Sequence, residues 1–213
     1  MSLRTSLCVT RDPIALSPFA DELRAMDERQ GERTAGISMT NEDLRGRRFE
    51  DCYFERCDLT KADLGGAYLM RCTFVECDLS MVKLSGASMQ EVEFTGCRMM
   101  GLDLSVCKPM LFSARFTECR LDHALLTGPA MKGQHFERCS LQGADFSGAD
   151  LRAAVFDRCD LHDAVFDRCD LRDADLTTAF GFRIDLAANR MAGARFSPAG
   201  AMALLAQHGV VVE

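Results

Sequence analysis

Apolar residues recur along this chain with a period of five. From Met39 to Phe196 an apolar side chain falls at almost every fifth position, with a two-residue shift around Ser105–Met110 and one miss at Gly181. A helix would need a period near 3.6 and a strand a period of two, so neither element holds these residues on one face. A chain that turns a corner every five residues can hold all of them on its inner face. We therefore predict a coil of short straight sides, each with one large apolar side chain inside.

A second period of twenty runs through the same region. Both phenylalanine and cysteine repeat at this interval, and both series absorb the two-residue shift at the same place, so we expect them to stack in register. A fixed long period indicates a solenoid, and four sides of five residues make one coil of twenty. About eight coils between residues 37 and 196, at roughly 4.8 Å each, predict a rod on the order of 38 Å long. The ladders are Phe54, Phe74, Phe94, Phe116, Phe136 and Phe156, then Leu176 and Phe196, and Cys57, Cys77, Cys97, Cys119, Cys139 and Cys159.

A small residue stands two positions before each large one, and aspartate often lies between them, as in Ala62–Leu64 and Ala144–Phe146. This motif resembles the A-[DN]-L-x-x motif of the pentapeptide-repeat family over about three-quarters of the chain. The resemblance implies an all-β fold, a right-handed quadrilateral β-helix. The three remaining positions of each pentad face water, which reconciles 47% hydrophobic residues with 27% charged ones.

The chain has eleven cysteines, but their spacing favours packing over chemistry. Ten fall in the small-residue position or at the shift (Cys107), where cysteine acts as a small hydrophobic residue. No C-x-x-C occurs and the four histidines lack ligand spacing, so we predict buried reduced thiols and no metal or cofactor; a redox or metal role is the alternative. Nucleotide-binding and hydrolase motifs are also missing. We therefore expect no catalytic residues and no enzyme activity.

The two ends differ from the repeats. Residues 1–36 form an N-terminal extension with a predicted capping helix at 18–30, and 197–213 form a second helix that starts at Ser197-Pro198 and stops at Gly209, followed by a short strand at 210–212. No apolar run is long enough to span a membrane and no signal peptide is evident, so we expect a cytoplasmic protein that does not bind membranes. The apolar C-terminal residues predict a homodimer interface: Met202, Leu204, Leu205, Val210 and Val211.

The net charge of −7 is concentrated near the C-terminal end of the repeats. Residues 141–176 hold nine aspartates against four arginines. Without a basic stripe, direct nucleic-acid binding is disfavoured. These acids are either a protein-binding surface or the solvated positions of the pentad motif, and the sequence does not separate the two. The predicted acidic surface contains Asp145, Asp150, Asp160, Asp170, Asp175 and Asp185.

A pentad solenoid that ends in a helix and Gly209–Val212 is similar to the Qnr and Mfp-type fluoroquinolone-resistance proteins. That resemblance implies a DNA-mimicking homodimer that binds DNA gyrase or topoisomerase IV and protects it from quinolones. Qnr proteins of Gram-negative bacteria carry sizeable projecting loops, whereas this chain has only the two-residue shift, as in the Mfp type. A generic protein-interaction scaffold without a topoisomerase role is the alternative, because pentads are common to both.

Overall fold

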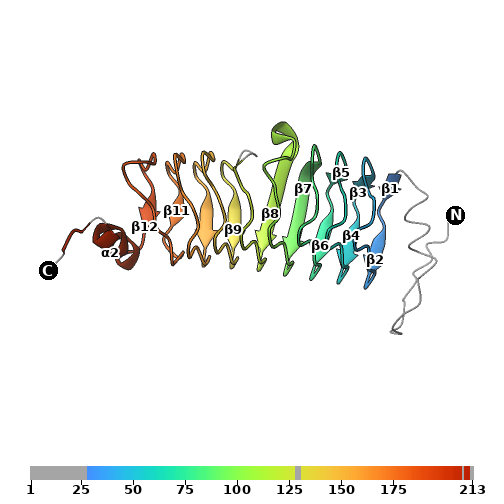
Figure 1. Cartoon of the computed structure of the whole chain (residues 1–213), viewed down its shortest axis with the longest axis horizontal. Coiled ribbons are helices and arrows are strands. Elements are labelled where there is room, and N and C mark those ends of the chain that lie inside the picture. The colour runs from blue at the N-terminus through green and yellow to red at the C-terminus, as the bar shows by residue number, and fades with distance from the viewer. Residues whose placement is uncertain (1–27, 128–130, 208, 212–213) are drawn as a thin grey trace.

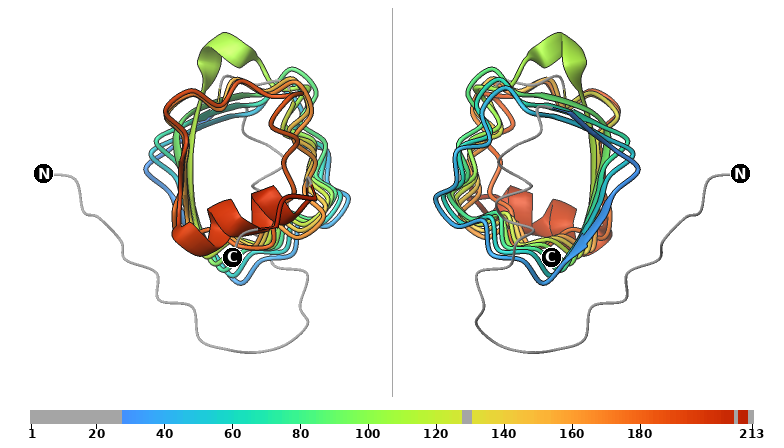
Figure 2. Two further views of the ribbon diagram at one scale, coloured as in Figure 1. Left: turned by 90° about the vertical axis from the view of Figure 1, so that its left-hand side faces the viewer. Right: turned by 90° about the vertical axis from the view of Figure 1, so that its right-hand side faces the viewer.

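The computed structural model is a parallel-strand β-solenoid of about eight turns with one short C-terminal helix (Figure 1). It describes residues 28–127, 131–207 and 209–211. Viewed along the rod, successive coils superpose as a four-sided outline (Figure 2). The all-β fold predicted from the pentads is confirmed.

The strands are short because each occupies only one side of a coil. All their pairings are parallel, and residues twenty apart face one another, for example Phe54 opposite Phe74. One path runs β1-β3-β5-β7-β8-β9-β10-β11-β12, while β2, β4 and β6 pair beside it and join β7. The strands are β1 (Glu28–Gln30), β2 (Arg33–Ala35), β3 (Arg48–Glu50), β4 (Tyr53–Glu55), β5 (Tyr68–Met70), β6 (Thr73–Val75), β7 (Ser88–Thr95), β8 (Phe112–Thr117), β9 (His135–Glu137), β10 (Val155–Asp157), β11 (Asp175–Leu176) and β12 (Arg195–Phe196).

The four sides of the rod are named here by their inward residues. Side 1 contains Phe49, Leu69 and Met89; side 2 contains the phenylalanine ladder. Side 3 contains Leu59, Leu79 and Met99, and side 4 contains Leu44, Leu64 and Leu84 with their counterparts in later coils. Nearly all of these side chains are buried in one continuous core; the exceptions are at the C-terminal end, where Phe196 is partly buried and Leu186 is exposed. Six rings of the ladder on side 2, from Phe54 to Phe156, stack with centroids 4.7–5.5 Å apart and interplanar angles of 5–16°.

The corners explain the five-residue period. The Ala62 N–H donates to the Leu59 carbonyl at 2.9 Å and closes a β-turn, and Lys61, its second central residue, has φ of +58°. Between corners the chain bonds to its neighbours: Asp58 N–H donates to the carbonyl of Ile37 in the preceding coil, and Leu59 N–H to that of Asp78 in the next. The backbone groups of each side are thus satisfied between coils, as a buried parallel sheet requires.

The solenoid begins earlier than the apolar pattern indicates. Strands β1 and β2 pair with β3 and β4, so the regular coil already includes Glu28, the first described residue, and not only the chain from residue 37. The predicted helix at 18–30 is wrong at its last three residues, which form β1, and residues 18–27 lie outside the described part of the chain. The apolar period does not extend to this coil, because its inward residues, Arg29 and Thr34, are polar yet buried.

Two irregular turns shift the inward positions. The extra residues form a 3-10 turn, η1 (Pro109–Leu111), that projects from the rod (Figure 2). Leu111 lies five residues before Phe116 and is therefore an inward residue by the sequence pattern, but it is exposed, and Phe112 takes its place opposite Met89. Near the other end Leu186 is also exposed. The buried residues there are Phe182 and Ile184.

The last coil is covered by α2 (Pro198–Gln207), which lies across the end of the rod (Figure 2). Ser197 Oγ accepts a hydrogen bond from Gly200 N–H at 3.0 Å, and Gly209, with φ of +72°, ends the helix as predicted. Val210 N–H then bonds to the Leu205 carbonyl, the pattern of a Schellman C-cap. The expected strand at 210–212 is wrong for Val210 and Val211, which are not in a strand.

Candidate interaction surface

The aspartates of the pentads hold the corners in place. In eleven of them Oδ1 accepts a hydrogen bond from the backbone N–H two residues later, at 2.8–3.4 Å. This is an Asx turn, in which the side chain takes the place of a backbone carbonyl. All six aspartates of the predicted acidic surface do this. Their first role is therefore structural.

These six aspartates do not share one face. Asp150 and Asp170 are bridge partners on side 1, and Asp160 is on side 3, opposite Ser140 and Phe180. Asp175 belongs to β11 on side 2. Asp145 is on side 4, where it pairs with Leu125 and Val165. Asp185 takes the corresponding sequence position forty residues later, in the irregular coil, and is followed by the exposed Leu186. The acidic block at 141–176 therefore winds around the rod instead of forming one surface.

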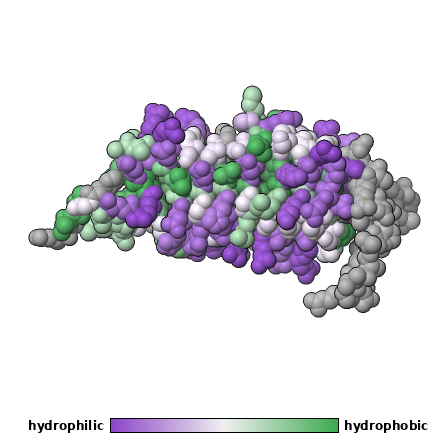
Figure 3. Space-filling model, in the orientation of Figure 1, coloured by the Kyte–Doolittle hydropathy of each residue, from purple (hydrophilic) through white to green (hydrophobic). Residues whose placement is uncertain are grey.

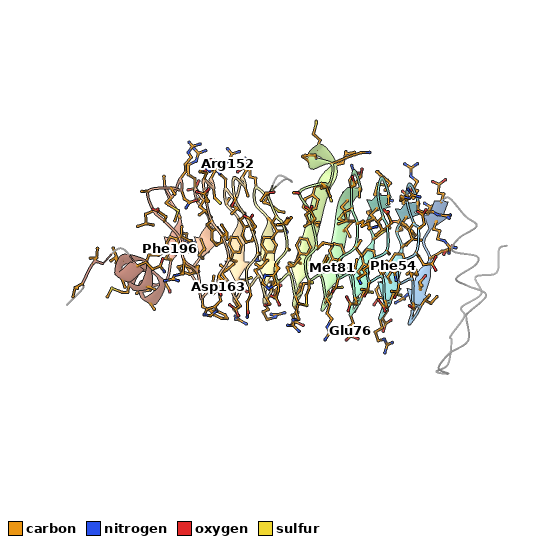
Figure 4. All side chains as sticks on the ribbon, in the orientation of Figure 1. Phe54, Glu76, Met81, Arg152, Asp163 and Phe196 are labelled. Carbon is orange, nitrogen blue, oxygen red and sulfur yellow. The ribbon has the colours of Figure 1, made fainter. Side chains whose placement is uncertain are left out.

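Arginines neutralise much of side 1. The Arg152 guanidinium bonds to both oxygens of Asp150, at 2.8 and 2.6 Å, and Arg172 engages Asp170 at the same two distances. Arg190 adds a contact to Asp170 at 3.2 Å. Hydrogen bonding to Arg172 lowers the pKa of Asp170 to about 2. Side 1 is therefore a surface of ion pairs. Arg152 of this side lies on the long edge of the rod opposite Glu76, which follows the phenylalanine ladder of side 2 (Figure 4).

Side 4 is the acidic side of the molecule. The described residues carry a net charge of −5, and the seven acidic and three basic residues of side 4 account for −4 of it. Within the described residues no cation lies within salt-bridge distance of Asp63, Asp103, Asp145 or Asp185, and their Oδ2 atoms accept no hydrogen bond. The charged residues of side 4 are Glu42, Asp43, Asp63, Asp103, Asp145, Asp167 and Asp185, with Arg45, Lys83 and Arg168.

Apolar side chains interrupt these acids. Leu125 and Val165 occupy the position that aspartate holds in neighbouring coils, and both are exposed. Successive coils thus present Asp103, Leu125, Asp145 and Val165 in a row. Hydrophilic and hydrophobic surface is likewise intermixed along the visible face of the rod (Figure 3).

The cysteines form a stack of buried thiols. Ten free cysteines are described, all buried; Cys8 lies outside the described residues. Within the ladder each Sγ donates to the carbonyl 23 to 25 residues earlier, as Cys119 does to Phe94 at 3.4 Å. Hydrogen bonding to Cys139, together with burial, raises the pKa of Cys119 to about 12. Such a thiol stays protonated near neutral pH and reacts slowly.

The predicted dimer residues separate into two groups. Leu204 is 3% exposed and packs in the core of its own chain, so it is wrong as an interface residue. Leu205 is half-buried, whereas Met202, Val210 and Val211 are exposed, Val211 to 83%. Gly209–Val211 extend beyond α2, away from the rod (Figure 1). An apolar edge therefore remains on the outer face of this end.

The described residues form neither a metal-ligand cluster nor a membrane-spanning helix. No group of three or more histidine, cysteine or acidic side chains is placed to hold a metal ion there. No helix in the same residues is long and apolar enough to cross a membrane.

The repeats place the chain in a known family. A model described as pentapeptide repeat region matches residues 47–126, and a second, pentapeptide repeats (8 copies), matches 114–152 and 139–177. Together they cover more than half of the sequence. The chain belongs to the pentapeptide-repeat family. No curated protein matches it.

Solved structures share the fold at low identity. HetL from the cyanobacterium Nostoc sp. strain PCC 7120, a protein involved in heterocyst differentiation regulation, is 21% identical with a TM-score of 0.55, over 81% of this chain and 90% of HetL. QnrB1, a plasmid-mediated fluoroquinolone resistance protein, is 20% identical with a TM-score of 0.45, over 86% of this chain and all of QnrB1. The likeness to HetL shows the fold alone, and the likeness to QnrB1 is too low to support a functional argument.

Proposed function

We propose that this protein is a non-catalytic rod that binds a protein partner through side 4, and that DNA gyrase or topoisomerase IV is the partner to test first. The observation that carries the proposal is the row of aspartates on side 4 without cationic partners. A basic groove that normally holds DNA would complement this side in sign. The rod would then act as a DNA mimic and modulate the topoisomerase or protect it from quinolones.

The Asx turns make these carboxylates suited to binding. Oδ1 of Asp145 is fixed by the Ser147 N–H at 2.8 Å, and Oδ1 of Asp103 by Ser105 in the same way. Each carboxylate is held in one orientation while its second oxygen remains available. A partner's lysine or arginine then gains a charge-assisted hydrogen bond without having to order the acid first.

The charge density limits how closely the rod can imitate DNA. A net charge of −5 over eight coils of roughly 4.8 Å gives about one charge per 8 Å. Duplex DNA carries one per roughly 1.7 Å. Binding to a DNA groove must therefore depend on shape and on the apolar residues between the acids as well as on charge. We expect a weaker salt dependence than DNA itself shows.

The decisive experiment removes charge from side 4 without disturbing the corners. Asparagine keeps the Oδ1 acceptor of an Asx turn, so the triple variant Asp103→Asn, Asp145→Asn, Asp185→Asn should fold normally. In a gyrase supercoiling assay, with and without ciprofloxacin, we expect the parent protein to inhibit or protect at micromolar concentration. The triple variant should need at least about tenfold more protein, a loss of roughly 1.4 kcal/mol.

The matched control makes the same charge change on side 3, with Asp58→Asn, Asp78→Asn and Asp160→Asn, which also form Asx turns. Equal losses in both triples would mean that only net charge matters and would overturn side 4 as the binding surface. No effect of the parent protein on gyrase or topoisomerase IV would move the assignment to a scaffold for another partner.

The C-terminal edge supports a second part of this proposal, a homodimer through the outer face of α2 and Gly209–Val211. Met202 on α2 and Val211 beyond it are both exposed apolar side chains of this edge. Sedimentation should show a dimer that Met202→Asp with Val211→Asp converts to a folded monomer. Met81→Asp, which changes an exposed methionine on side 3, should leave the dimer intact. A monomeric parent protein would exclude this interface.

A further inference from the structure

The second break in the repeat lies near the C-terminal end, and a cavity open to solvent is found there. Gly181 takes the place of an inward apolar residue, and the chain from Phe180 to Arg183 departs from the pentad before α2 begins. Between this segment and the helix lies a cavity of about 500 Å³. Small-molecule sites have volumes of this order. It is lined by His162, Asp163, Ala179, Phe180, Gly181, Phe182, Arg183, Ser197, Ala199, Gly200, Ala203 and Gln207.

Aromatic rings form part of its wall. His162 and Phe180 meet edge to face with centroids 6.0 Å apart, and Phe182 packs against Phe196 at 5.5 Å. Phe180 is 50% exposed, although it bridges to Asp160 and occupies a position that is polar on side 3 in the two preceding coils. A large aromatic side chain at a solvent position, beside a cavity, is the arrangement expected where an apolar ligand is held.

Two glycines allow the walls to approach. A Cβ at Gly181 would collide with the His162 ring, and Gly181 also has φ of +76°. A Cβ at Gly200 would lie 2.9 Å from Phe182 Cζ. The glycine that interrupts the apolar period thus lets the His162 ring pack closely against the backbone at the edge of the cavity.

Two opposite charges line the same cavity. Within the described residues Arg183 has no carboxylate at salt-bridge distance, and no hydrogen bond or cationic partner engages Asp163. His162 is held by Asp160, its Nδ1 2.6 Å from Oδ1, which orients the ring. Ser197 Oγ accepts from Gly200 N–H, so its own proton is free to be donated. A ligand that satisfies both charged groups carries a carboxylate and an ammonium group.

We propose that this cavity binds a small aromatic zwitterion, of the class of free aromatic amino acids. The carboxylate pairs with Arg183, whose planar guanidinium favours bidentate contacts with carboxylates. The ammonium pairs with Asp163. The ring packs against Phe180 and Phe182. This site is at the end of the rod and is independent of side 4.

The test uses the full chain and three probes of one size. L-phenylalanine carries both charges, 3-phenylpropionate lacks the ammonium, and 2-phenylethylamine lacks the carboxylate. In ¹⁵N–¹H NMR titrations the Gly181 and Gly200 amides report on the cavity. We expect L-phenylalanine to shift both amides, and each half-ligand to bind at least tenfold more weakly. Either half-ligand binding as tightly as L-phenylalanine would overturn the pairing of both charges.

Variants then assign the contacts. Arg183→Gln should abolish the preference for L-phenylalanine over 2-phenylethylamine, and Asp163→Asn its preference over 3-phenylpropionate. Asparagine tolerates the positive φ of position 163 (+56°), so the corner should persist. The controls are Arg168→Gln and Asp173→Asn, which lie outside the cavity and should change nothing.

A second copy of the chain is the competing occupant, because the apolar C-terminal edge is adjacent. Failure of L-phenylalanine to shift Gly181 or Gly200 at millimolar concentration would overturn the proposal. If Phe180→Ala or Arg183→Gln at the same time weakened self-association in sedimentation, the cavity would be reassigned as part of a protein interface.

Discussion

At the scale of the residue, each pentad position has its own physical requirement. The residue two places before the centre must be small, because it is buried beside a large neighbour; Ala62, Cys77 and Ala144 all meet this condition. The next residue favours aspartate because it closes an Asx turn. Two places after the centre the backbone is left-handed, with φ near +55° at sixteen non-glycine residues. The motif is therefore explained by corner geometry before any function is invoked.

The left-handed corners predict a stabilising substitution. Ala153 has φ of +54°, is exposed and keeps its N–H bonded to the Arg172 carbonyl. An L-residue pays roughly 1–2 kcal/mol in this region, so Ala153→Gly should raise the free energy of unfolding by about 0.5–1 kcal/mol after the entropy of glycine in the unfolded chain is counted. Urea unfolding measures it. Ala154→Gly, next to it in the buried small position, should destabilise by about 1 kcal/mol; the same sign for both would contradict the corner argument.

At the scale of the element, the phenylalanine ladder is the part of the fold that the sequence predicts best. Its period of twenty appears directly in the parallel register, and each ring stacks on the next. The ladder stops at Leu176, and Phe196 is only half-buried against Phe182.

Position along the ladder should therefore decide the effect of removing a ring. Phe136 stacks between Phe116 and Phe156, so Phe136→Ala should lower the free energy of unfolding by about 3–5 kcal/mol. Phe196→Ala should cost about half of that, because less area is buried. Denaturant melts of the two variants test this. Equal effects would show that stacking within the ladder adds nothing to burial.

Side chains at the irregular coils could not be assigned from the pattern. Phe112 replaces Leu111 and Ile184 replaces Leu186 because looped residues move the inward position by one or two places. Asn189 enters the small position, donating to the Phe166 carbonyl at 2.9 Å and accepting from Cys169 N–H at 2.8 Å, the bonds that satisfy a buried amide.

The distribution of the aspartates, by contrast, was already contained in the spacing. Asp145 and Asp150 are five residues apart and so belong to adjacent sides, whereas residues twenty apart, such as Asp150 and Asp170, share one. Charge summed along the chain does not separate the sides, whereas charge summed by position within the twenty-residue coil identifies side 4 as the acidic side. The cavity beside α2 is indicated in the sequence by one feature, the interruption of the five-residue apolar period at Gly181.

At the scale of the whole molecule, the buried thiols should make the free energy of unfolding decrease at alkaline pH. Burial raises the pKa of Cys107 to about 12 and that of Cys169 to about 11, above the ordinary value of 9.0. A raised thiol pKa means that the unfolded chain loses the proton first. The contribution is fully present below about pH 9 and is lost as the pH rises toward the folded values.

We therefore expect the free energy of unfolding, measured under reducing conditions, to fall from about pH 9 toward pH 11. Each such cysteine contributes a slope of up to about 1.4 kcal/mol per pH unit. Cys107→Ala should make the dependence shallower. Cys159→Ala should not, because a hydrogen bond from Cys139 lowers the pKa of Cys159. A flat profile in the parent protein would mean that solvent reaches Cys107 and Cys169.

The projecting turn η1 has a consequence for how the rod can change its length. It takes up the extra residues before Phe112 outside the coil, so every later residue keeps its side and its stacking partner. Met110, at this turn, is 96% exposed. The corner between Cys107 and Phe112 should therefore tolerate insertions, because a peptide inserted there does not rotate the surfaces of the later coils. Ten residues added inside a straight side would instead turn the rest of the rod by two sides and carry the acids of side 4 to the opposite face.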